Sequence, residues 1–154
     1  MPLAACVGPH FERSLALTGN HRGDFGGRAA VGMIRGDNGW ITQLVATGES
    51  SGFFAAAGGL AWRAPAGVTP RAELAAGVAT RAVNLGGHCH TDPEDGTNDC
   101  HDGLGPYGEL EVGLDVPLGD EQAPALTFAA GGTLYLNSDD LEERLVFLVG
   151  VAWK

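Results

Sequence analysis

The sequence predicts an all-β fold, an eight-stranded antiparallel up-and-down β-barrel that crosses a membrane, and three observations lead to it. The chain divides at turn-forming residues into eight segments, most of them close to the roughly 9–11 residues that a tilted strand needs to cross a bilayer. Some segments alternate between apolar and polar side chains, which is the period of a β-strand. Trp40 and Trp62 adjoin turns and Trp153 is the penultimate residue, so all three would lie at one end of such a sheet.

The expected strands lie between turn signals rich in Gly, Pro, Asn and Asp. They cover residues 10–18, 27–35, 40–48, 53–63, 70–84, 106–117, 125–137 and 143–153. The connections alternate between two rims. The lower rim has turns at 36–39, 64–69 and 118–124, and the upper rim has loops at 19–26, 49–52, 85–105 and 138–142. Residues 10–154 are therefore expected to form one barrel domain, after an N-terminal segment of residues 1–9.

The alternation is clearest in the sixth segment, where every second residue is apolar. One face carries Leu110, Val112, Leu114 and Val116, and the other carries Glu109, Glu111, Gly113 and Asp115. The fifth segment repeats the pattern with Ala, Leu and Val against Arg71, Glu73 and Arg81. The eighth segment is apolar on both faces, and we expect Phe147 and Val149 to share the outward face of Val112.

Aromatic residues cluster near the expected ends of the strands. The lower rim would hold Phe11, Trp40, Trp62 and Trp153, and the upper rim Phe25, Phe53, Phe54, Tyr107 and Tyr135. Tryptophan and tyrosine concentrate at membrane–water interfaces because their rings are apolar while their N–H or O–H groups need water. Two aromatic belts separated by a band of Ala, Val, Leu and Gly are typical of a transmembrane barrel.

The face opposite the apolar one carries charges of both signs in equal number. Its members are Glu12, Arg28, Arg63, Arg71, Glu73, Arg81, Glu109, Glu111, Asp115 and Arg144. An enclosed charge is costly unless it is paired, so a balanced set favours the interior, and antiparallel pairing suggests that Arg81 meets Glu109 or Glu111. Side chains can fill an eight-stranded barrel, so we expect no open pore. Arg13 would face lipid and reach the interface near the lower rim.

Composition excludes several classes of protein. The chain has 154 residues and a formal net charge of −10, with few lysines and dispersed arginines, which argues against nucleic-acid binding. No stretch approaches the roughly 18 apolar residues of a membrane helix. No secretory signal is visible, although Leu3-Ala4-Ala5-Cys6 resembles the lipobox of bacterial lipoproteins and makes Cys6 a candidate for lipidation.

The upper loop 85–105 gathers cysteines and histidines, namely His88, Cys89, His90, Cys100 and His101. A disulfide between Cys89 and Cys100 is favoured if this loop lies outside the cell, in an oxidising environment. The alternative is zinc, held by both thiolates and two of the three histidines. The acidic run 92–99 lacks the order of residues of a calcium loop, but it could contact a cation or a basic surface partner.

These features together resemble the small eight-stranded outer-membrane β-barrel proteins of the OmpA/OmpX type. The resemblance covers about residues 10–154 and includes short lower turns, longer upper loops and a final strand, Leu145 to Trp153, that is apolar at alternate positions. In that family the final strand ends in an aromatic residue, whereas here Lys154 follows it. The resemblance implies the outer membrane of a Gram-negative bacterium, contact with membrane lipid and periplasmic termini.

We therefore expect a non-enzymatic barrel without cofactor, with a structural or surface-interaction role. Ser50, Ser51, Ser138 and His21 are the candidate catalytic residues at the upper rim, but none lies in a nucleophile motif. Two alternatives remain. A soluble lipocalin-like barrel carrying a small apolar ligand would turn its apolar side chains inward. A lipid-modifying barrel enzyme of the outer membrane would need Ser and His within hydrogen-bonding distance.

Overall fold

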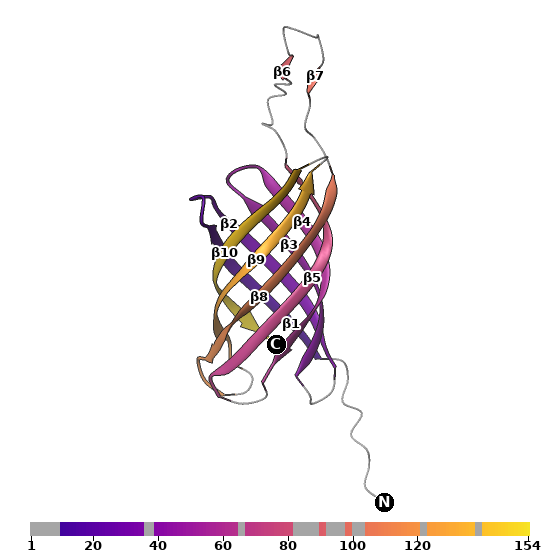
Figure 1. Cartoon of the computed structure of the whole chain (residues 1–154). Helices are drawn as coiled ribbons and strands as arrows, with labels where there is room; N and C mark the ends of the chain where they lie inside the picture. The colour runs from indigo at the N-terminus through magenta and orange to yellow at the C-terminus, as the bar shows by residue number, and fades with distance from the viewer. Residues whose placement is uncertain are drawn as a thin grey trace, which may run out of the picture.

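A computed structural model describes residues 10–35, 39–64, 67–81, 90–91, 98–99, 104–120, 123–137 and 140–154 (Figure 1). Eight long strands cross the molecule. They are β1 (His10–Asn20), β2 (Phe25–Arg35), β3 (Trp40–Glu49), β4 (Phe53–Arg63), β5 (Thr69–Arg81), β8 (Gly105–Pro117), β9 (Ala125–Asn137) and β10 (Asp140–Trp153). Two short strands, β6 (His90–Thr91) and β7 (Asn98–Asp99), pair with each other between β5 and β8.

The eight predicted strands are confirmed, with small shifts at their ends. The strand β5 is described only to Arg81, because the predicted residues 82–84 lie outside the described ones. The largest shift within the described residues is in β10, which begins at Asp140, three residues before the predicted start. Its first residues are mostly acidic and suggested a loop, but they continue the ladder opposite β9. The pairing of β6 with β7 was not predicted, because two-residue strands leave no periodic signal. The described residues contain no helix with the length and hydrophobicity needed to cross a membrane.

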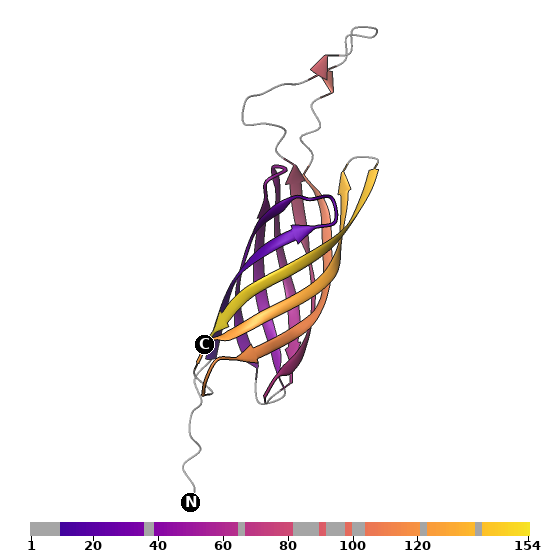
Figure 2. The ribbon, with the colours of Figure 1, turned by 90° about the vertical axis from the view of Figure 1, so that its left-hand side faces the viewer.

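The sheet closes into a barrel because β1 pairs with the last strand, with Arg13 opposite Trp153. All pairs are antiparallel, and the order around the barrel is β1-β10-β9-β8-β5-β4-β3-β2. In this order β2 and β8 are four strands apart in both directions, so they form opposite walls. The start of β1 and the end of β10 share the lower rim, while β6 and β7 project beyond the upper rim (Figures 1 and 2).

The barrel is apolar outside and charged inside. Leu110 and Val149 on the outer face are 57% and 52% exposed, whereas the inward-facing Glu73 and Arg28 are 1% and 4% exposed. The outward orientation predicted for the apolar face of β8 is confirmed for Leu110, Val112 and Leu114, and that predicted for β10 is confirmed for Phe147 and Val149. This polarity is the reverse of that of a water-soluble sheet and matches a barrel in lipid.

The aromatic belts are partly as predicted. At the lower rim Phe11 and Trp40 are exposed, and Trp62 and Trp153 face outward and are half-buried. At the upper rim Phe25 and Phe54 face outward. Assigning the other three aromatics of that rim to a belt was wrong, because they share the inward parity of Arg63, Glu109 and Thr133. They lie buried in the lumen as an aromatic layer of Phe53, Tyr107 and Tyr135.

Glycines on the inner face allow the strands to curve closely around the lumen. A Cβ atom at Gly77 would lie 2.0 Å from the Ala56 carbonyl oxygen, and one at Gly131 would lie 2.2 Å from the Leu110 carbonyl oxygen. Such distances are far inside van der Waals contact, so a side chain there would displace backbone. Glycine kinks of this kind are a recognised way to bend strands into a small barrel.

Candidate functional site

The lumen contains a continuous chain of ion pairs, here called the central charge cluster. Its members are Glu12, Arg28, Arg63, Arg71, Glu73, Glu109, Glu111 and Asp115. Alternating inward positions on β1, β2, β4, β5 and β8 supply these side chains. All of them except Arg63 are buried. The expected charged interior is therefore present, and every member of this cluster was assigned to the inner face from the alternation of the sequence.

Arg28 is the hub of the central charge cluster. It extends from β2 across the lumen to the opposite wall, where its Nη2 lies 2.9 Å from Glu109 Oε1 on β8. The same guanidinium hydrogen-bonds Glu73 on β5, and its Nε lies 3.8 Å from Glu111 Oε1. The side chains of Arg28 and Glu109 thus meet across the lumen and bridge opposite walls of the barrel.

The lower half of the cluster is held by two further arginines. Arg71 Nη2 lies 2.6 Å from Glu73 Oε2, and Arg71 Nη1 lies 3.7 Å from Asp115 Oδ1. Arg63 binds Glu12 through both terminal nitrogens, at 2.5 and 2.8 Å, and its Nε lies 2.5 Å from Asp115 Oδ2. The fork of a guanidinium suits this bidentate geometry. The contact between Arg71 and Asp115 is the longest of these.

The central charge cluster has five carboxylates but only three guanidiniums. The other two arginines predicted for the inner face, Arg81 and Arg144, also face the lumen but lie nearer the upper rim. Neutral donors supply part of the compensation, since the Tyr107 hydroxyl donates to Glu109 Oε2 at 2.6 Å and the Thr127 hydroxyl donates to Asp115 Oδ1 at 2.6 Å. Glu111 is the least compensated member. Its Oε2 atom is buried and has no hydrogen-bond partner among the described residues.

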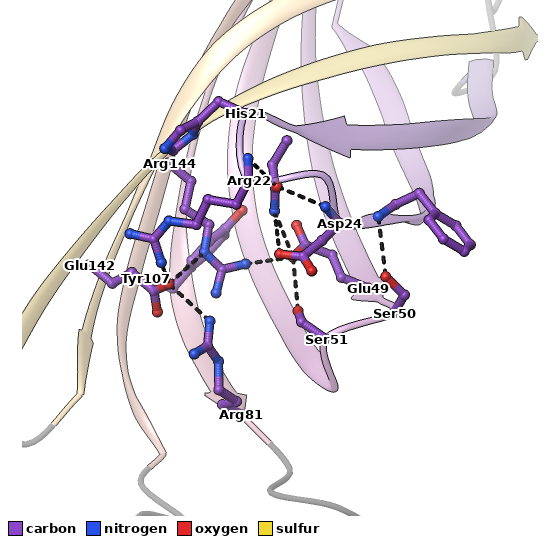
Figure 3. A network of polar contacts seen from close by, with 12 residues as sticks. His21, Arg22, Asp24, Glu49, Ser50, Ser51, Arg81, Tyr107, Glu142 and Arg144 are labelled. Carbon is purple, nitrogen blue, oxygen red and sulfur yellow. Dashed lines mark hydrogen bonds and ion pairs between the residues drawn. The ribbon is translucent and has the colours of Figure 1, made fainter.

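A second group, the upper-rim cluster, consists of Arg22, Glu49, Arg81, Glu142 and Arg144 (Figure 3). Glu142 on β10 accepts contacts from three arginines: Arg22 at 2.5 Å, Arg81 at 2.9 Å and Arg144 at 3.1 Å. Arg144 also reaches Glu49 on β3 at 2.5 Å. The Arg144 guanidinium stacks over the Phe53 ring at 4.2 Å, so the aromatic layer adjoins this cluster from below.

The expected pairing of Arg81 with Glu109 or Glu111 was wrong. In the register of β5 and β8, Ala75 faces Glu109 and Glu73 faces Glu111. Arg81 is therefore six residues higher on β5 than the position opposite Glu109. It meets Glu142 instead, across the upper lumen.

Sequence reasoning missed Glu49 and Glu142, because both fall in segments that were assigned to upper loops. The available signal was parity: Glu142 is two residues before Arg144, and Glu49 follows the inward series of Gln43 and Val45. Both positions therefore face the lumen once the strands are extended by a few residues.

The candidate catalytic residues at the upper rim use their polar atoms in local structure. The Leu145 backbone N–H donates to His21 Nδ1 at 3.1 Å. Ser50 Oγ accepts from the Phe25 N–H at 3.2 Å, and Ser51 Oγ donates to Glu49 at 3.4 Å. No hydrogen bond joins His21 to either serine among the described residues, and Ser138 lies outside them.

The candidate site of loop 85–105 falls mainly outside the described residues. This applies to His88, Cys89, Cys100 and His101, to most of the acidic run 92–99, and to Cys6 in the N-terminal segment. His90 is described only through its backbone, which pairs with Asp99 in the β6–β7 hairpin. The disulfide, the zinc alternative and the lipidation of Cys6 therefore stay predictions. In the part of the chain that is described, no group of three metal-binding side chains occurs.

Comparisons with known proteins support the fold. No protein-family model matches the chain, and no curated protein matches it by sequence. Among solved structures, the chain is similar to the crystal structure of the outer membrane enzyme PagL, with a TM-score of 0.55 and 12% identity over 93% of this chain and 99% of that one. Identity this low establishes similarity of fold alone. The expected similarity to small eight-stranded outer-membrane barrels is confirmed at that level.

Proposed function

We propose that this protein is an integral outer-membrane barrel with a structural or surface-interaction role, a closed interior and no catalytic activity. The inverted polarity carries the proposal, because a continuous apolar outer wall would be unstable in water while a charged interior is compatible with lipid outside. The cross-lumen contacts of Arg28 support a barrel that conducts no solutes through its centre. The fold shared with an outer membrane protein supports the location.

In the proposed orientation the lower rim faces the periplasm of a Gram-negative bacterium and loop 85–105 faces the exterior. The end of β5 and the start of β8, which this loop joins in the sequence, lie at the rim opposite the start of β1 and the end of β10 (Figure 1). Longer loops on the outside and short turns on the periplasmic side are the usual arrangement in outer-membrane barrels. The acidic composition of residues 92–102 suits a cation or a basic surface partner.

Both alternatives predict features that can be compared with the structure. A lipocalin-like carrier needs an apolar lumen and a charged outer face, which is the opposite of the observed polarity. A lipid-modifying enzyme needs an activated nucleophile, whereas His21 and Ser50 both accept hydrogen bonds from the backbone. We therefore expect no ester hydrolysis when the folded barrel is mixed with outer-membrane lipids, and no labelling of Ser50 or Ser51 by a serine-directed phosphonate probe.

The substitution Val149→Arg tests membrane insertion. Val149 faces outward near the middle of β10, and an arginine at the bilayer midplane should cost about 2–4 kcal/mol of folding free energy. The matched control is Leu141→Arg at the upper rim of the same strand, where the cost should be about 0–1 kcal/mol. Urea titration of the barrel in lipid vesicles measures both. Equal stability of the two variants, or folding of the wild type without lipid or detergent, would contradict the proposal.

The register of the β6–β7 hairpin supports the predicted disulfide. His90 pairs with Asp99, and one step further along each strand leads to Cys89 and Cys100 in the sequence. Residues directly opposite each other in an antiparallel pair have Cα atoms about 4.5–5.5 Å apart, which falls within the range that a disulfide spans.

Mass spectrometry of the unreduced protein, together with a zinc assay, tests this pairing. We expect one linked peptide joining Cys89 and Cys100 and a mass lower by two hydrogens. Two free thiols with stoichiometric zinc would favour the metal alternative, with His88, His90 and His101 as candidate ligands. The same spectra report whether Cys6 carries a lipid.

A further inference from the structure

The outer wall carries an open groove near the lower rim, where the lipid-facing surface would otherwise be convex. It crosses β1, β2 and β3, ends at Trp153 of β10, and has a volume of about 420 Å³. Its floor is formed where outward-facing Ala29 and Ala46 lie side by side, in register with Leu15. The groove therefore exists because two small side chains lie beside larger apolar ones.

Arg13 lies at one end of this groove and faces outward. It has the parity of the exposed Phe11 and Leu15, is itself exposed, and is paired in register with Trp153. Among the described residues its guanidinium makes no ion pair or hydrogen bond, in contrast to the guanidiniums of the two interior clusters. A guanidinium on a lipid-facing wall needs acceptors, and at the level of the lower aromatic belt phospholipid phosphates can supply them.

We propose that this groove is a binding site for a phospholipid with an anionic headgroup. Arg13 binds the phosphate, one acyl chain occupies the groove, and the Trp153 indole lies at the interface beside the headgroup. The planar fork of arginine suits bidentate binding of phosphate. Because the whole chain has a formal charge of −10, general attraction to anionic lipid is absent, and the affinity depends on this one cation.

The dimensions of the groove suit an acyl chain. Its lining runs from β10 to β3, which spans three strand spacings of about 4.8 Å, or about 14 Å. The lining is almost entirely aliphatic apart from Arg13, Ser14 and Trp153, so it offers dispersion contacts to methylene groups and few polar partners. This arrangement distinguishes a lipid from a soluble phosphate, which would gain nothing from the apolar part.

The experiment uses the folded full-length barrel, and it rests on the proposed insertion into membranes. Wild type is placed in vesicles of phosphatidylcholine that contain brominated phosphatidylglycerol, and quenching of Trp153 is followed in a background carrying Trp40→Phe and Trp62→Phe. Native mass spectrometry of the detergent-purified protein counts retained phosphatidylglycerol. We expect Arg13→Gln to weaken the apparent affinity about tenfold, the equivalent of one charge-assisted contact, and Arg13→Lys to weaken it less.

Two further variants test the contribution of the groove to lipid binding separately from that of the Arg13 charge. Ala46→Leu fills the groove and should also reduce retention of the lipid, whereas Ala76→Leu, an outward-facing alanine on β5 away from the groove, should not. Glycerol phosphate at millimolar concentration should not compete. Competition by glycerol phosphate, equal binding by Arg13→Gln, or an unchanged Ala46→Leu variant would overturn the proposal, as would a dimer whose groove is covered by a second copy. Failure of the wild type to fold into vesicles would instead refute the proposed membrane function.

Discussion

The central charge cluster and the upper-rim cluster are built from the same side chains, arginines with carboxylates, but they differ in burial and in charge balance. In the central cluster the carboxylates outnumber the guanidiniums, and Arg28 and Glu73 are almost completely enclosed. In the upper-rim cluster three arginines share Glu142, and the side chains of Arg22 and Arg81 are 47% and 36% exposed.

The difference shows where an ion pair matters for stability in this barrel. Exposed pairs are typically worth about 0–1 kcal/mol because water solvates both partners. Removing one partner of an enclosed pair costs about 3–5 kcal/mol because the other charge is left buried. The aromatic layer of Phe53, Tyr107 and Tyr135 adjoins both clusters: the Tyr107 hydroxyl binds Glu109, and the Phe53 ring lies under Arg144.

The largest effect is expected for Arg28→Met, which removes the hub of the central charge cluster. Glu73, Glu109 and Glu111 would lose their shared cation, so the free energy of unfolding in vesicles should fall by about 3–5 kcal/mol. Urea titration followed by tryptophan fluorescence measures it. The double variant with Glu73→Gln should recover part of the loss, because it removes one of the uncompensated charges. A loss below about 1 kcal/mol in Arg28→Met would mean that water reaches this level of the lumen.

An intermediate effect is expected for Phe53→Leu, which alters the layer beside both clusters. Phe53 contacts the rings of Tyr107 and Tyr135 at 5.9 and 5.6 Å between centroids. Loss of these contacts and of the stacked Arg144 should cost about 1–2 kcal/mol. The adjacent Phe54→Leu is the matched control, since Phe54 faces outward and makes none of these contacts. If both variants were equally stable, the layer would contribute no specific packing.

The smallest effect is expected for Arg81→Met in the upper-rim cluster. Glu142 keeps Arg22 and Arg144 as partners, so the loss should be at most about 1 kcal/mol, and the difference from wild type should shrink in high salt. Arg144→Met is the comparison within the same cluster, because that guanidinium is enclosed and should cost more. If Arg81→Met lowered the free energy of unfolding by about 3 kcal/mol or more, Arg81 would contribute as much to stability as an enclosed arginine of the central charge cluster.

Much of the candidate site could be predicted from the alternation of residues. Period two places Arg71, Glu73, Glu109 and Glu111 on one face without any knowledge of the partner strands, and all four lie inside. Which acid meets which arginine could not be predicted in the same way. Arg81 was expected to meet Glu109 or Glu111, but in the register of β5 and β8 it lies six residues above the position opposite Glu109 and further still above the one opposite Glu111.

The aromatic residues of the upper rim also show what could not be predicted from position along a strand alone. A position near a strand end places a residue at a rim, and this was sufficient for Phe25 and Phe54. It was insufficient for Phe53, where parity rather than height decides between lipid and lumen. Parity can be read from the sequence once the strand is known, so this assignment was within reach of sequence reasoning.

The sequence by itself therefore determined the strands, their alternation between rims and which face meets lipid, because these depend on local period and on turn chemistry. The tertiary structure decided the partners across the lumen, the shared role of Glu142 and the groove beside Arg13. These depend on the stagger between strands when the sheet closes, which brings together side chains such as Arg28 and Glu109 that are 81 residues apart in the chain.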